Sequence, residues 1–478
     1  MAQGEDGAVV LLLLPASKLN KKMKRHILYI ISGCLLLSGC KIYKNYERPA
    51  EMEQLSGLYR DAAEGDTVNF GNLPWRQVFT EPQLQTLIEK ALVNNADMKK
   101  AELNIQKAKA GLKVAKLAYL PSLAIAPQGT VSSFDWSKAS QTYSIPLSAS
   151  WEIGQMGYLR NVKKQADVML LQSKVAKEAT QSAIIGGVAT LYYTLTMLDE
   201  QLRTTKETIV LWEKNVEAME AMKEAAMVNE AAVAQTKANY YELQASVPKL
   251  ENSIRQVENS LSILLHETPQ AIERGAFTAD GFPAEMSAGI PMQLLSNRPD
   301  VRLAEYNLAS KFYDVNVARS AFYPGLTISG ALTFTNSAGS MVLNPGKFIA
   351  SAVGSIVQPL FANGRLRANL KVKKLDMEAA EIDFREALLN AGMEVSNALD
   401  AYQTAIKQQT LREKEVVEME RANENIQFLF THTNTTSYLE TLTAQQGLLS
   451  AQLALINDKY SKVQAAINLY QALGGGRQ

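Results

Sequence analysis

The stretch ARSAFYPGLTI, residues 318–328, resembles AKLAYLPSLAI, residues 115–125, and the two lie 203 residues apart. Pro324 and Pro121 fall in register, and each follows a run rich in Ala, Lys and Leu. Proline ends a helix and favours extended geometry in the residue before it. Each stretch therefore predicts a change from helix to extended chain, and the pair indicates an internal repeat.

Two further pairs of segments occur at nearly the same offset. GYLRNVKKQAD (157–167) resembles GRLRANLKVKK (364–374), 207 residues on, and MVNEAAVAQTKA (227–238) resembles TTSYLETLTAQQ (435–446), 208 residues on. Three pairs at one spacing favour a duplicated unit over two unrelated domains. We expect residues 83–290 to form the first repeat and residues 291–476 the second, each with a helix, two strands and a long helical hairpin.

The extended segments alternate large apolar residues with small or polar ones. LTISGALTFT (326–335) and FIASAVGSIVQPL (348–360) follow each other in the second repeat, and 122–134 and 140–153 hold the same places in the first. Period-two alternation gives a strand one apolar and one polar face. Strands of about ten residues also have the length that crosses a bilayer when tilted. A two-stranded hairpin packed on helices is the alternative.

Four strands neither close a barrel nor hide their edges from lipid, so strands that span a membrane require several chains to share one barrel. The helices are expected at 83–117 and 300–320, and in two runs without proline, 158–226 and 364–432. A helix as long as either run reaches about 100 Å and needs neighbours along its whole length. The strands that interrupt each repeat disfavour the alternative of a filamentous coiled coil.

The N-terminal region has the pattern of a secretory signal. Lysines and an arginine precede an apolar stretch, 27–37, that is short for a membrane-spanning helix. Leu37-Ser38-Gly39-Cys40 resembles a bacterial lipobox, in which Cys40 is lipidated and becomes the first mature residue. An ordinary signal peptide with an incidental cysteine is the alternative. We expect a signal peptide at 1–39, with Met23 as a possible translation start, and a lipidated N-terminal segment at 40–82.

Composition argues against several classes of function. The mature chain would keep Cys40 as its one cysteine and a net charge of about −2, which predicts neither a disulfide framework nor nucleic-acid binding. His266 and His432 would remain far apart with no cysteine nearby, which disfavours a zinc site. The sequence shows no nucleophile–base pair or phosphate-binding loop. We therefore expect no catalysis, no metal and no cofactor besides the covalent lipid.

Four motifs carry a resemblance to a known family. They are RPDVRLAEYNLAS (298–310), AFYPGLTISG (321–330), QPLFANGRLRA (358–368) and TSYLETLTAQQGLLSAQLALINDKYSKVQAAINLYQALGGG (436–476). The chain resembles the outer-membrane efflux proteins, the TolC-like family, and within it the lipid-anchored outer-membrane factors of tripartite multidrug efflux systems (NodT-type lipoproteins). The resemblance implies a mixed α/β membrane protein in which a homotrimer forms a 12-stranded β-barrel, continuous with a long periplasmic α-helical barrel.

The resemblance also implies a function. The protein would be the outer-membrane exit duct for drugs or other small toxic compounds, with a periplasmic adaptor (membrane fusion) protein and an inner-membrane proton-driven transporter as partners. A duct for type I-like protein or peptide secretion is one alternative, and a lipid-anchored periplasmic structural or enzymatic protein is another. The lipobox favours efflux, and Lys41 in place of aspartate favours sorting to the outer membrane.

In the family, the helical tips farthest from the strands contact the adaptor and adjoin the closed aperture. The matching tips here are 224–235 and 431–445, which predicts adaptor contacts at Ala226, Met227, Val228, Asn229, Asn434, Thr435, Thr436 and Ser437. The family favours glycine where Ala226 stands, which argues against a tight first turn. Asn434 holds that place in the second tip, and asparagine tolerates the left-handed conformation.

Relatives narrow the aperture with carboxylates just past the second tip. Glu440 falls at one such position, and Thr443 stands at the next. Three copies of Glu440 brought together would repel and raise one another's pKa. A solvated glutamate on a helix face is the alternative. Elsewhere, Arg298-Pro299-Asp300 is expected to begin a helix, and the ALGGG sequence to end one before a flexible tail.

Overall fold

The computed structural model describes residues 43–53, 70–133, 135–155, 157–279, 281–282, 297–335, 347–433 and 437–477. The chain divides into two units, Met1–Tyr46 and Glu47–Gln478. Of the first unit only residues 43–46 are described, and they are neither helical nor extended in a sheet. The signal sequence and Cys40 lie outside the described residues, and every element below belongs to the second unit.

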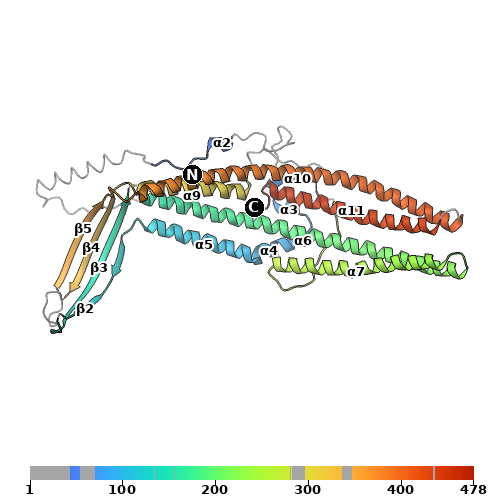
Figure 1. Cartoon of the computed structure of the whole chain (residues 1–478), viewed down its shortest axis with the longest axis horizontal. Coiled ribbons are helices and arrows are strands. Elements are labelled where there is room, and N and C mark those ends of the chain that lie inside the picture. Colours follow the sequence, from blue (N-terminus) through green and yellow to red (C-terminus); the bar gives the residue numbers. More distant parts are fainter. Residues whose placement is uncertain are drawn as a thin grey trace. The chain divides into compact units, whose positions relative to one another are not determined.

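One antiparallel sheet gathers strands from both halves of the chain (Figure 1). β1 and β2 both pair with β3, one after the other, β3 pairs with β4, and β4 pairs with β5. The strands are β1 (Ser122–Ile125), β2 (Gln128–Ser132), β3 (Ser140–Gln155), β4 (Gly325–Thr335) and β5 (Lys347–Val357). The first extended segment is thus two strands, because Pro127, between them, has no N–H to donate to the ladder.

The register gives the sheet one apolar and one hydroxyl-rich face. Leu147 lies opposite Leu332 on β4 and opposite Ile125 on β1, and Trp151 lies opposite Ile328. The alternate positions form the other face, whose hydroxyl residues include Ser144, Ser148, Ser150, Thr327, Ser329, Thr333, Ser351 and Ser355. The predicted period-two pattern is therefore present, and its apolar side is exposed in the single chain.

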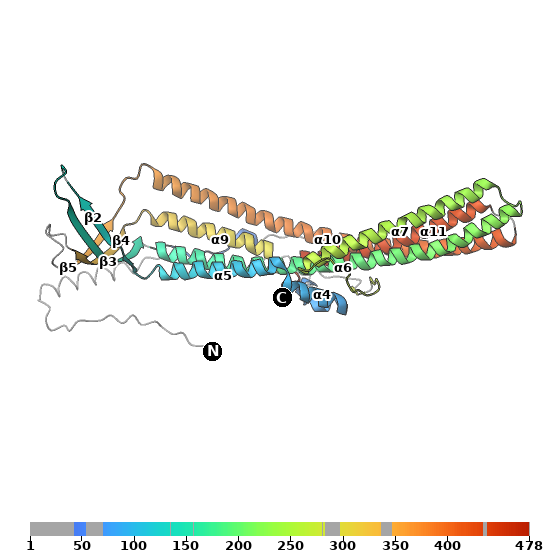
Figure 2. The ribbon, with the colours of Figure 1, turned by 90° about the horizontal axis from the view of Figure 1, so that it is seen from below.

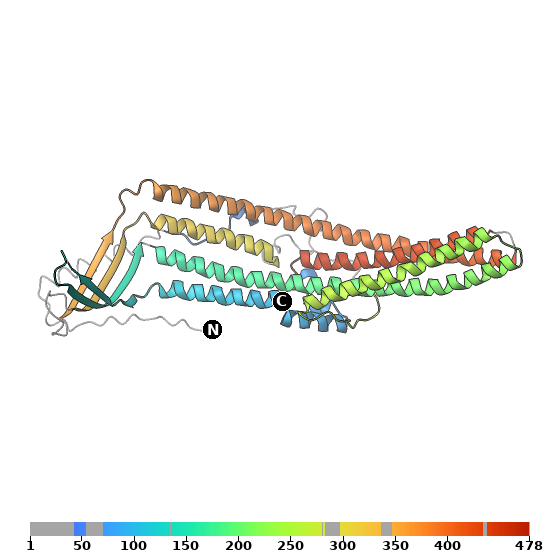
Figure 3. The same cartoon turned by 60° about the horizontal axis from the view of Figure 1, so that its bottom comes forward.

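Helices extend from the sheet in two successive rows that share their longest members (Figure 3). In the row next to the sheet, α5 packs on α6, α6 on α9 and α9 on α10; beyond it, α7 packs on α6, α6 on α11 and α11 on α10. The bounds are α5 (Ala96–Leu117), α6 (Tyr158–Glu224), α7 (Glu230–Leu264), α9 (Pro299–Ser320), α10 (Arg365–His432) and α11 (Tyr438–Ala472). α6 and α10 have 67 and 68 residues, hence about 100 Å each.

The same local signals begin corresponding helices in the two halves. Gly157 precedes α6 and Gly364 precedes α10, with φ of 80° and 78°, which is a conformation that glycine adopts without strain. Pro299 occupies the first turn of α9, as predicted, because its fixed φ suits a helix start. The helix expected at 83–117 is instead two helices, since Asn95 interrupts it.

Short elements complete the middle of the second unit. Their bounds are α2 (Ala50–Glu53), η1 (Phe70–Asn72), α3 (Trp75–Val78) and α4 (Pro82–Asn94). Tyr470 of α11 forms edge-to-face pairs with Phe70 and Phe79, with ring centroids 5.5 and 5.9 Å apart. Each fully buried side chain of this size stabilises the fold by about 1.5–3 kcal/mol. Buried aromatic side chains therefore pack together where the two rows of helices meet.

Among the helices in the described parts of the chain, none is both long enough and apolar enough to cross a membrane.

Candidate functional site: the hairpin tips and helix junctions

The ends of the two helical hairpins lie at the opposite end of the helices from the sheet (Figure 2). In the first tip Ala226 has a φ of 56°, and its N–H donates to the Lys223 carbonyl at 2.9 Å. The Met227 N–H donates to the Met222 carbonyl at 2.8 Å. This pair of bonds is the Schellman motif that commonly ends helices. The first turn is therefore tight, contrary to expectation, although alanine costs about 1–2 kcal/mol in this conformation.

The first tip ends where α7 begins. Asn229 is the N-cap of α7, and its Oδ1 accepts from the Ala232 N–H at 3.0 Å. Met227 is 61% exposed, and Val228 is half-buried between these two caps. Four predicted contact residues, 226–229, therefore form one compact surface turn.

The second tip is described on both sides of residues 434–436. The Thr433 N–H donates to the Leu429 carbonyl at 3.0 Å where α10 ends. Ser437 is the N-cap of α11. Asn434, Thr435 and Thr436 lie outside the described residues, so the expected turn at Asn434 stays a prediction.

Glu440 takes part in capping its own helix. The Ser437 N–H donates to Glu440 Oε2 at 3.0 Å, and the Glu440 N–H donates to Ser437 Oγ at 3.3 Å, which together make a capping box. Thr443 Oγ1 donates to the Leu439 carbonyl at 2.8 Å. The structure therefore gives both residues a role within α11, and their role at an aperture stays a prediction.

Hydrogen bonds near the tips join the two hairpins. The hydroxyls of Thr236 on α7 and Tyr438 on α11 lie 2.5 Å apart, and Asn215 Nδ2 on α6 donates to Gln445 Oε1 on α11 at 2.7 Å. Thr236 is fully buried, and burial raises the pKa of Tyr438. The phenol therefore stays protonated at neutral pH and available for this bond. These residues were not predicted, because no local pattern relates side chains about 200 positions apart.

Two hollows lie between the hairpins, on either side of Trp212 and Leu449. One has a volume of about 520 Å³ and is bordered by α6, α10 and α11, and the other has about 660 Å³ and is bordered by α6, α7 and α11. Trp212 is 3% exposed and fills the space between them. Apart from Trp212 and nearby leucines, the linings are mainly polar and charged, including Glu200, Arg203 and Glu242.

Asn95 joins the end of one helix to the start of another. Its Nδ2 donates to the Leu264 carbonyl at the end of α7 at 2.8 Å. Its Oδ1 accepts from the N–H groups of Asp97 and Met98 at the start of α5, at 2.8 and 3.3 Å. A single amide thus satisfies a free carbonyl and two free N–H groups that helix ends leave without partners.

Arg298 occupies the corresponding junction in the second half. Its Nη1 donates to the Ala472 carbonyl at the end of α11 at 2.9 Å. Its Nη2 lies 2.6 Å from both Asp300 Oδ2 and Glu394 Oε2, and only 7% of the residue is exposed. A buried guanidinium needs such partners. Arg298 therefore does more than precede a helix: it ties α11 and α9 to α10.

The chain end is held at this junction, so the expectation of a flexible tail is wrong. Gly474 has a φ of 79° and ends α11 in a Schellman motif. A Cβ on Gly475 would lie 2.5 Å from the Tyr470 ring, so only glycine fits there. Arg477 donates to Asn72 Oδ1 at 2.7 Å. The glycines permit close packing here rather than mobility.

The described residues hold no group of three or more His, Cys, Asp or Glu that could bind a metal ion.

Comparison with known proteins identifies the family. A family model described as outer membrane efflux protein matches residues 87–265 and 290–475. The chain belongs to the outer membrane efflux protein family. This confirms the predicted resemblance, and the protein is accordingly an efflux channel component of the outer membrane.

Among relatives of this efflux protein, cation efflux system protein CusC of Escherichia coli (strain K12) is 26% identical over 446 residues, which cover 92% of this chain and 97% of CusC. Toluene efflux pump outer membrane protein TtgC of Pseudomonas putida is 28% identical over 472 residues, which cover 95% of this chain and 96% of TtgC.

Solved structures show the same fold. A crystal structure of CusC matches with a TM-score of 0.82 at 25% identity, over 91% of this chain and all of that one. The open state of the Neisseria gonorrhoeae MtrE outer membrane channel matches with a TM-score of 0.82 at 24% identity, over 92% and 99% of the two chains.

Proposed function

We propose that this efflux protein is the exit duct of a tripartite pump, in which a trimer crosses the outer membrane through its sheet and the periplasm through its helices. The observation that carries the proposal is the sheet with two unlike faces, joined directly to helices of about 100 Å. The apolar face suits lipid, and the hydroxyl-rich face suits a water-filled lumen.

The free edges of the single chain support the trimer. In the described part of the sheet, nothing pairs with the outer edge of β5 or with the outer edges of β1 and β2. Four strand positions from each of three chains give a closed barrel of 12, which leaves no edge exposed to lipid. The apolar strand face includes Leu123 and Ile356, which are 72% and 73% exposed in one chain.

The helices at the sides of each row also have unpartnered apolar surface. α10 exposes Leu375, Ile382 and Leu389 at a spacing of seven residues, and α5, at the other side of its row, exposes Leu103 and Val114. A stripe with that spacing packs against another helix. We propose that α10 of one chain covers α5 of the next, which closes the periplasmic barrel.

The repeated element order supports duplication within the chain. Each half contains a helix, extended segments, a long helix and a second arm of 35 residues, and the family model matches once in each half. We propose repeats at 83–290 and 291–476 that supply two strand positions each to the barrel.

The lipid anchor at Cys40 is a further part of the proposal. Arg48, eight residues after Cys40, pairs with Glu305 of α9 through two bonds of 2.8 and 2.7 Å. Arg48 is half-buried and Glu305 is buried, and a bidentate pair of this kind fixes orientation. Arg48 is therefore fixed on α9, and we propose that the acyl chains of Cys40 hold the mature N-terminus in the outer membrane.

The bonds between the hairpins suggest how the far end closes. The Thr236–Tyr438 and Asn215–Gln445 bonds hold the two hairpins of one chain together near the tips. We propose that an adaptor bound at 226–229 and 434–437 separates the hairpins and widens the aperture, with Glu440 and Thr443 at its rim. The hydroxyl-rich lumen has little charge, which suits drugs and other small toxic compounds. Relatives are named for the efflux of cations and toluene.

Crosslinking from the first tip tests the partners. A photoreactive amino acid replaces Asn229, and after irradiation of cells the captured proteins are identified by mass spectrometry. The same probe at Lys99, an exposed residue of α5 away from the tip, is the control. We expect an adaptor crosslinked from position 229 and not from 99, copurifying with a proton-driven transporter. An ATP-driven exporter with a secreted polypeptide would instead support secretion, and no specific partner from position 229 would contradict the proposal.

A further inference from the structure

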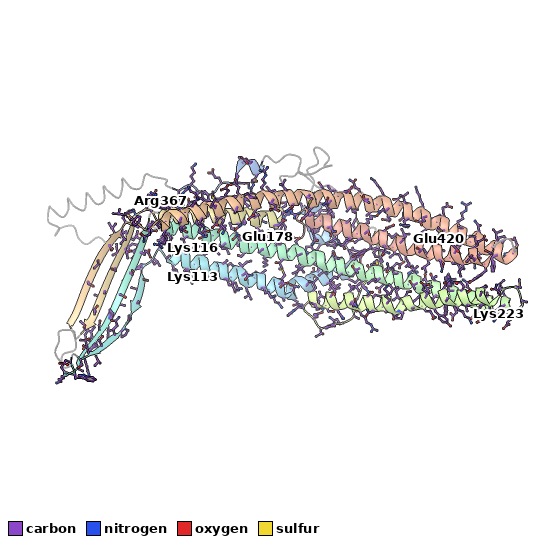
Figure 4. The ribbon with its side chains drawn as sticks, in the orientation of Figure 1. Lys113, Lys116, Glu178, Lys223, Arg367 and Glu420 are labelled. Carbon is purple, nitrogen blue, oxygen red and sulfur yellow. The ribbon has the colours of Figure 1, made fainter. Side chains whose placement is uncertain are left out.

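Positive charge gathers where the helices meet the sheet. The six residues nearest the sheet in each of α5, α6, α9 and α10 contain seven basic side chains and no acidic one. We call these residues the basic collar: Lys113, Lys116, Arg160, Lys163, Arg319, Arg365 and Arg367. Figure 4 shows Lys113, Lys116 and Arg367 at this end, whereas Lys223 lies at the opposite end. The whole chain has a net charge of only +1, so this is a local concentration.

Most of the collar is exposed and has no carboxylate partner among the described residues. Within the described part of the chain, Lys113, Lys116, Arg319, Arg365 and Arg367 make no ion pair, and all five are exposed. Outside the collar, some arginines contact one or two carboxylates, among them Arg274, Arg298 and Arg412. Others, such as Arg255, Arg385 and Arg421, are exposed and make no ion pair with any residue that the structure describes, so the collar is distinguished by the density of its cations. The collar therefore presents a dense group of exposed cations with no acidic side chain among the same helix-end residues.

Aromatic side chains lie at and just beyond the ends of the strands nearest the collar. Trp151, on the apolar face of β3, donates from Nε1 to the Tyr119 carbonyl at 3.0 Å. Phe322 precedes β4, and Phe361, which is 85% exposed, follows β5. Aromatic rings prefer the interface between hydrocarbon and water. The acidic residue at this level, Glu152, belongs to the opposite, hydroxyl-rich face of β3.

Along the molecule, an apolar strand face is thus followed by aromatic rings and then by cations. A membrane leaflet presents hydrocarbon, the interfacial region and phosphate groups in the same order. We propose that the basic collar binds the anionic phospholipid headgroups of the periplasmic leaflet. This inference rests on the proposed function, because it requires the sheet to span the outer membrane.

The distances suit such an interaction. Six helical residues span about 9 Å, close to the Debye length of about 8 Å at physiological ionic strength. The whole collar therefore lies within range of a charged surface. Each lysine or arginine near such a surface strengthens binding by about fivefold. In a trimer the collar repeats three times around the barrel, so that many weak contacts act together.

A lipid-binding measurement tests the collar. The purified trimer in a neutral detergent is titrated with phosphatidylglycerol or phosphatidylcholine, and bound lipid is counted by native mass spectrometry. We expect a preference of about tenfold or more for phosphatidylglycerol. Replacing Lys113, Lys116, Arg365 and Arg367 with glutamine should lower that preference to about twofold or less. Changing both arginines to lysine should preserve it, because the interaction is electrostatic.

A matched control removes the same charge elsewhere. Glutamine at Lys214, Arg255, Lys414 and Arg421, which are exposed, make no ion pair within the described residues and lie away from the collar, should leave the preference unchanged. Inorganic phosphate at the same charge concentration should not displace the lipid; displacement would show that the collar binds phosphate rather than a lipid surface. An unchanged preference in the collar variant would overturn the inference.

Channel recordings distinguish a failure of the lipid-binding proposal from a failure of the proposed duct function. In a phosphatidylcholine bilayer the collar variant and the unaltered protein should show the same conductance and the same ion selectivity. A change in anion selectivity would mean that the collar lines the lumen instead of contacting lipid. Absence of channels from the unaltered protein would contradict the proposed duct itself, whatever lipid it binds.

Discussion

At the junction of α7 with α5, the neutral amide of Asn95 caps both helices. At the junction of α11 with α9, the guanidinium of Arg298 bonds to the end of α11 and to Asp300 of α9. Asn95 bonds only to the backbone of the helices that it joins. Arg298 also engages Asp300 and Glu394. Because burying a charge requires such partners, the second junction becomes attached to α10. The two halves have the same order of elements, but they differ in how firmly the end of the helical hairpin is connected to the neighbouring helices.

The largest effect is expected at the charged junction. Arg298→Ala removes the buried cation that Asp300 and Glu394 share and leaves the Ala472 carbonyl without its donor, which should lower the free energy of unfolding by about 3 kcal/mol. Thermal unfolding in detergent, followed by circular dichroism, measures the change. Arg298→Lys keeps the charge but cannot reach all three acceptors, so its melting temperature should fall between those of the unaltered protein and Arg298→Ala. Equal melting temperatures for all three proteins would contradict this role.

A smaller loss is expected at the neutral junction. Asn95→Ala removes one bond to α7 and two to α5, and a lost N-cap costs about 1–2 kcal/mol. The same melting experiment should place this variant between the original protein and Arg298→Ala. If Asn95→Ala proved the more damaging substitution, the assignment of the firmer junction to the second half would be wrong.

The two tips allow a similar comparison. Ser437→Ala breaks the capping box at the start of α11 and should cost about 1 kcal/mol, and Asn229→Ala should cost about the same at the start of α7. Hydrogen exchange of the first turn of each helix measures the loss locally. Faster exchange restricted to the altered tip supports independent caps, whereas exchange that rises in both tips would show that they open together.

The smallest effect is a gain. Ala226→Gly relieves the positive φ at the end of α6 but makes the unfolded chain more flexible, so the net stabilisation should be about 0.5 kcal/mol. A small rise in melting temperature is the expected result. Ala225→Gly, one residue earlier where φ is −77°, serves as the control and should destabilise the protein. A loss in both variants would argue against the left-handed turn.

Much of the fold could be predicted from local patterns. Alternation located the strands, proline and glycine marked their limits, and proline-free runs located the long helices. The break at Asn95 was missed because helix-forming residues continue on both sides of it. The ALGGG sequence correctly predicts the end of α11, but a flexible tail after it is the wrong expectation, because the missing Cβ of Gly475 lets the backbone pack against Tyr470. Such packing depends on residues remote in sequence.

The site was only partly predictable, for the same reason. The position of the tips followed from the family resemblance, and the Ser437–Glu440 spacing is that of a capping box. The partners of Tyr438 and Arg298 were not foreseeable, because Thr236 and Glu394 come from other helices. Charge at the collar could be counted in the sequence, but its significance depends on where the helices meet the sheet.

The most direct test of the duct is single-channel conductance of the full-length protein in a planar lipid bilayer. We predict discrete channels of low conductance, since the hairpins are bonded to each other near their tips. Tyr438→Phe removes the hydroxyl that bonds to Thr236, and it should increase conductance or the time spent open. Discrete channels that respond to this substitution support the account. A purified trimer that forms no channels, with either residue at position 438, would contradict it.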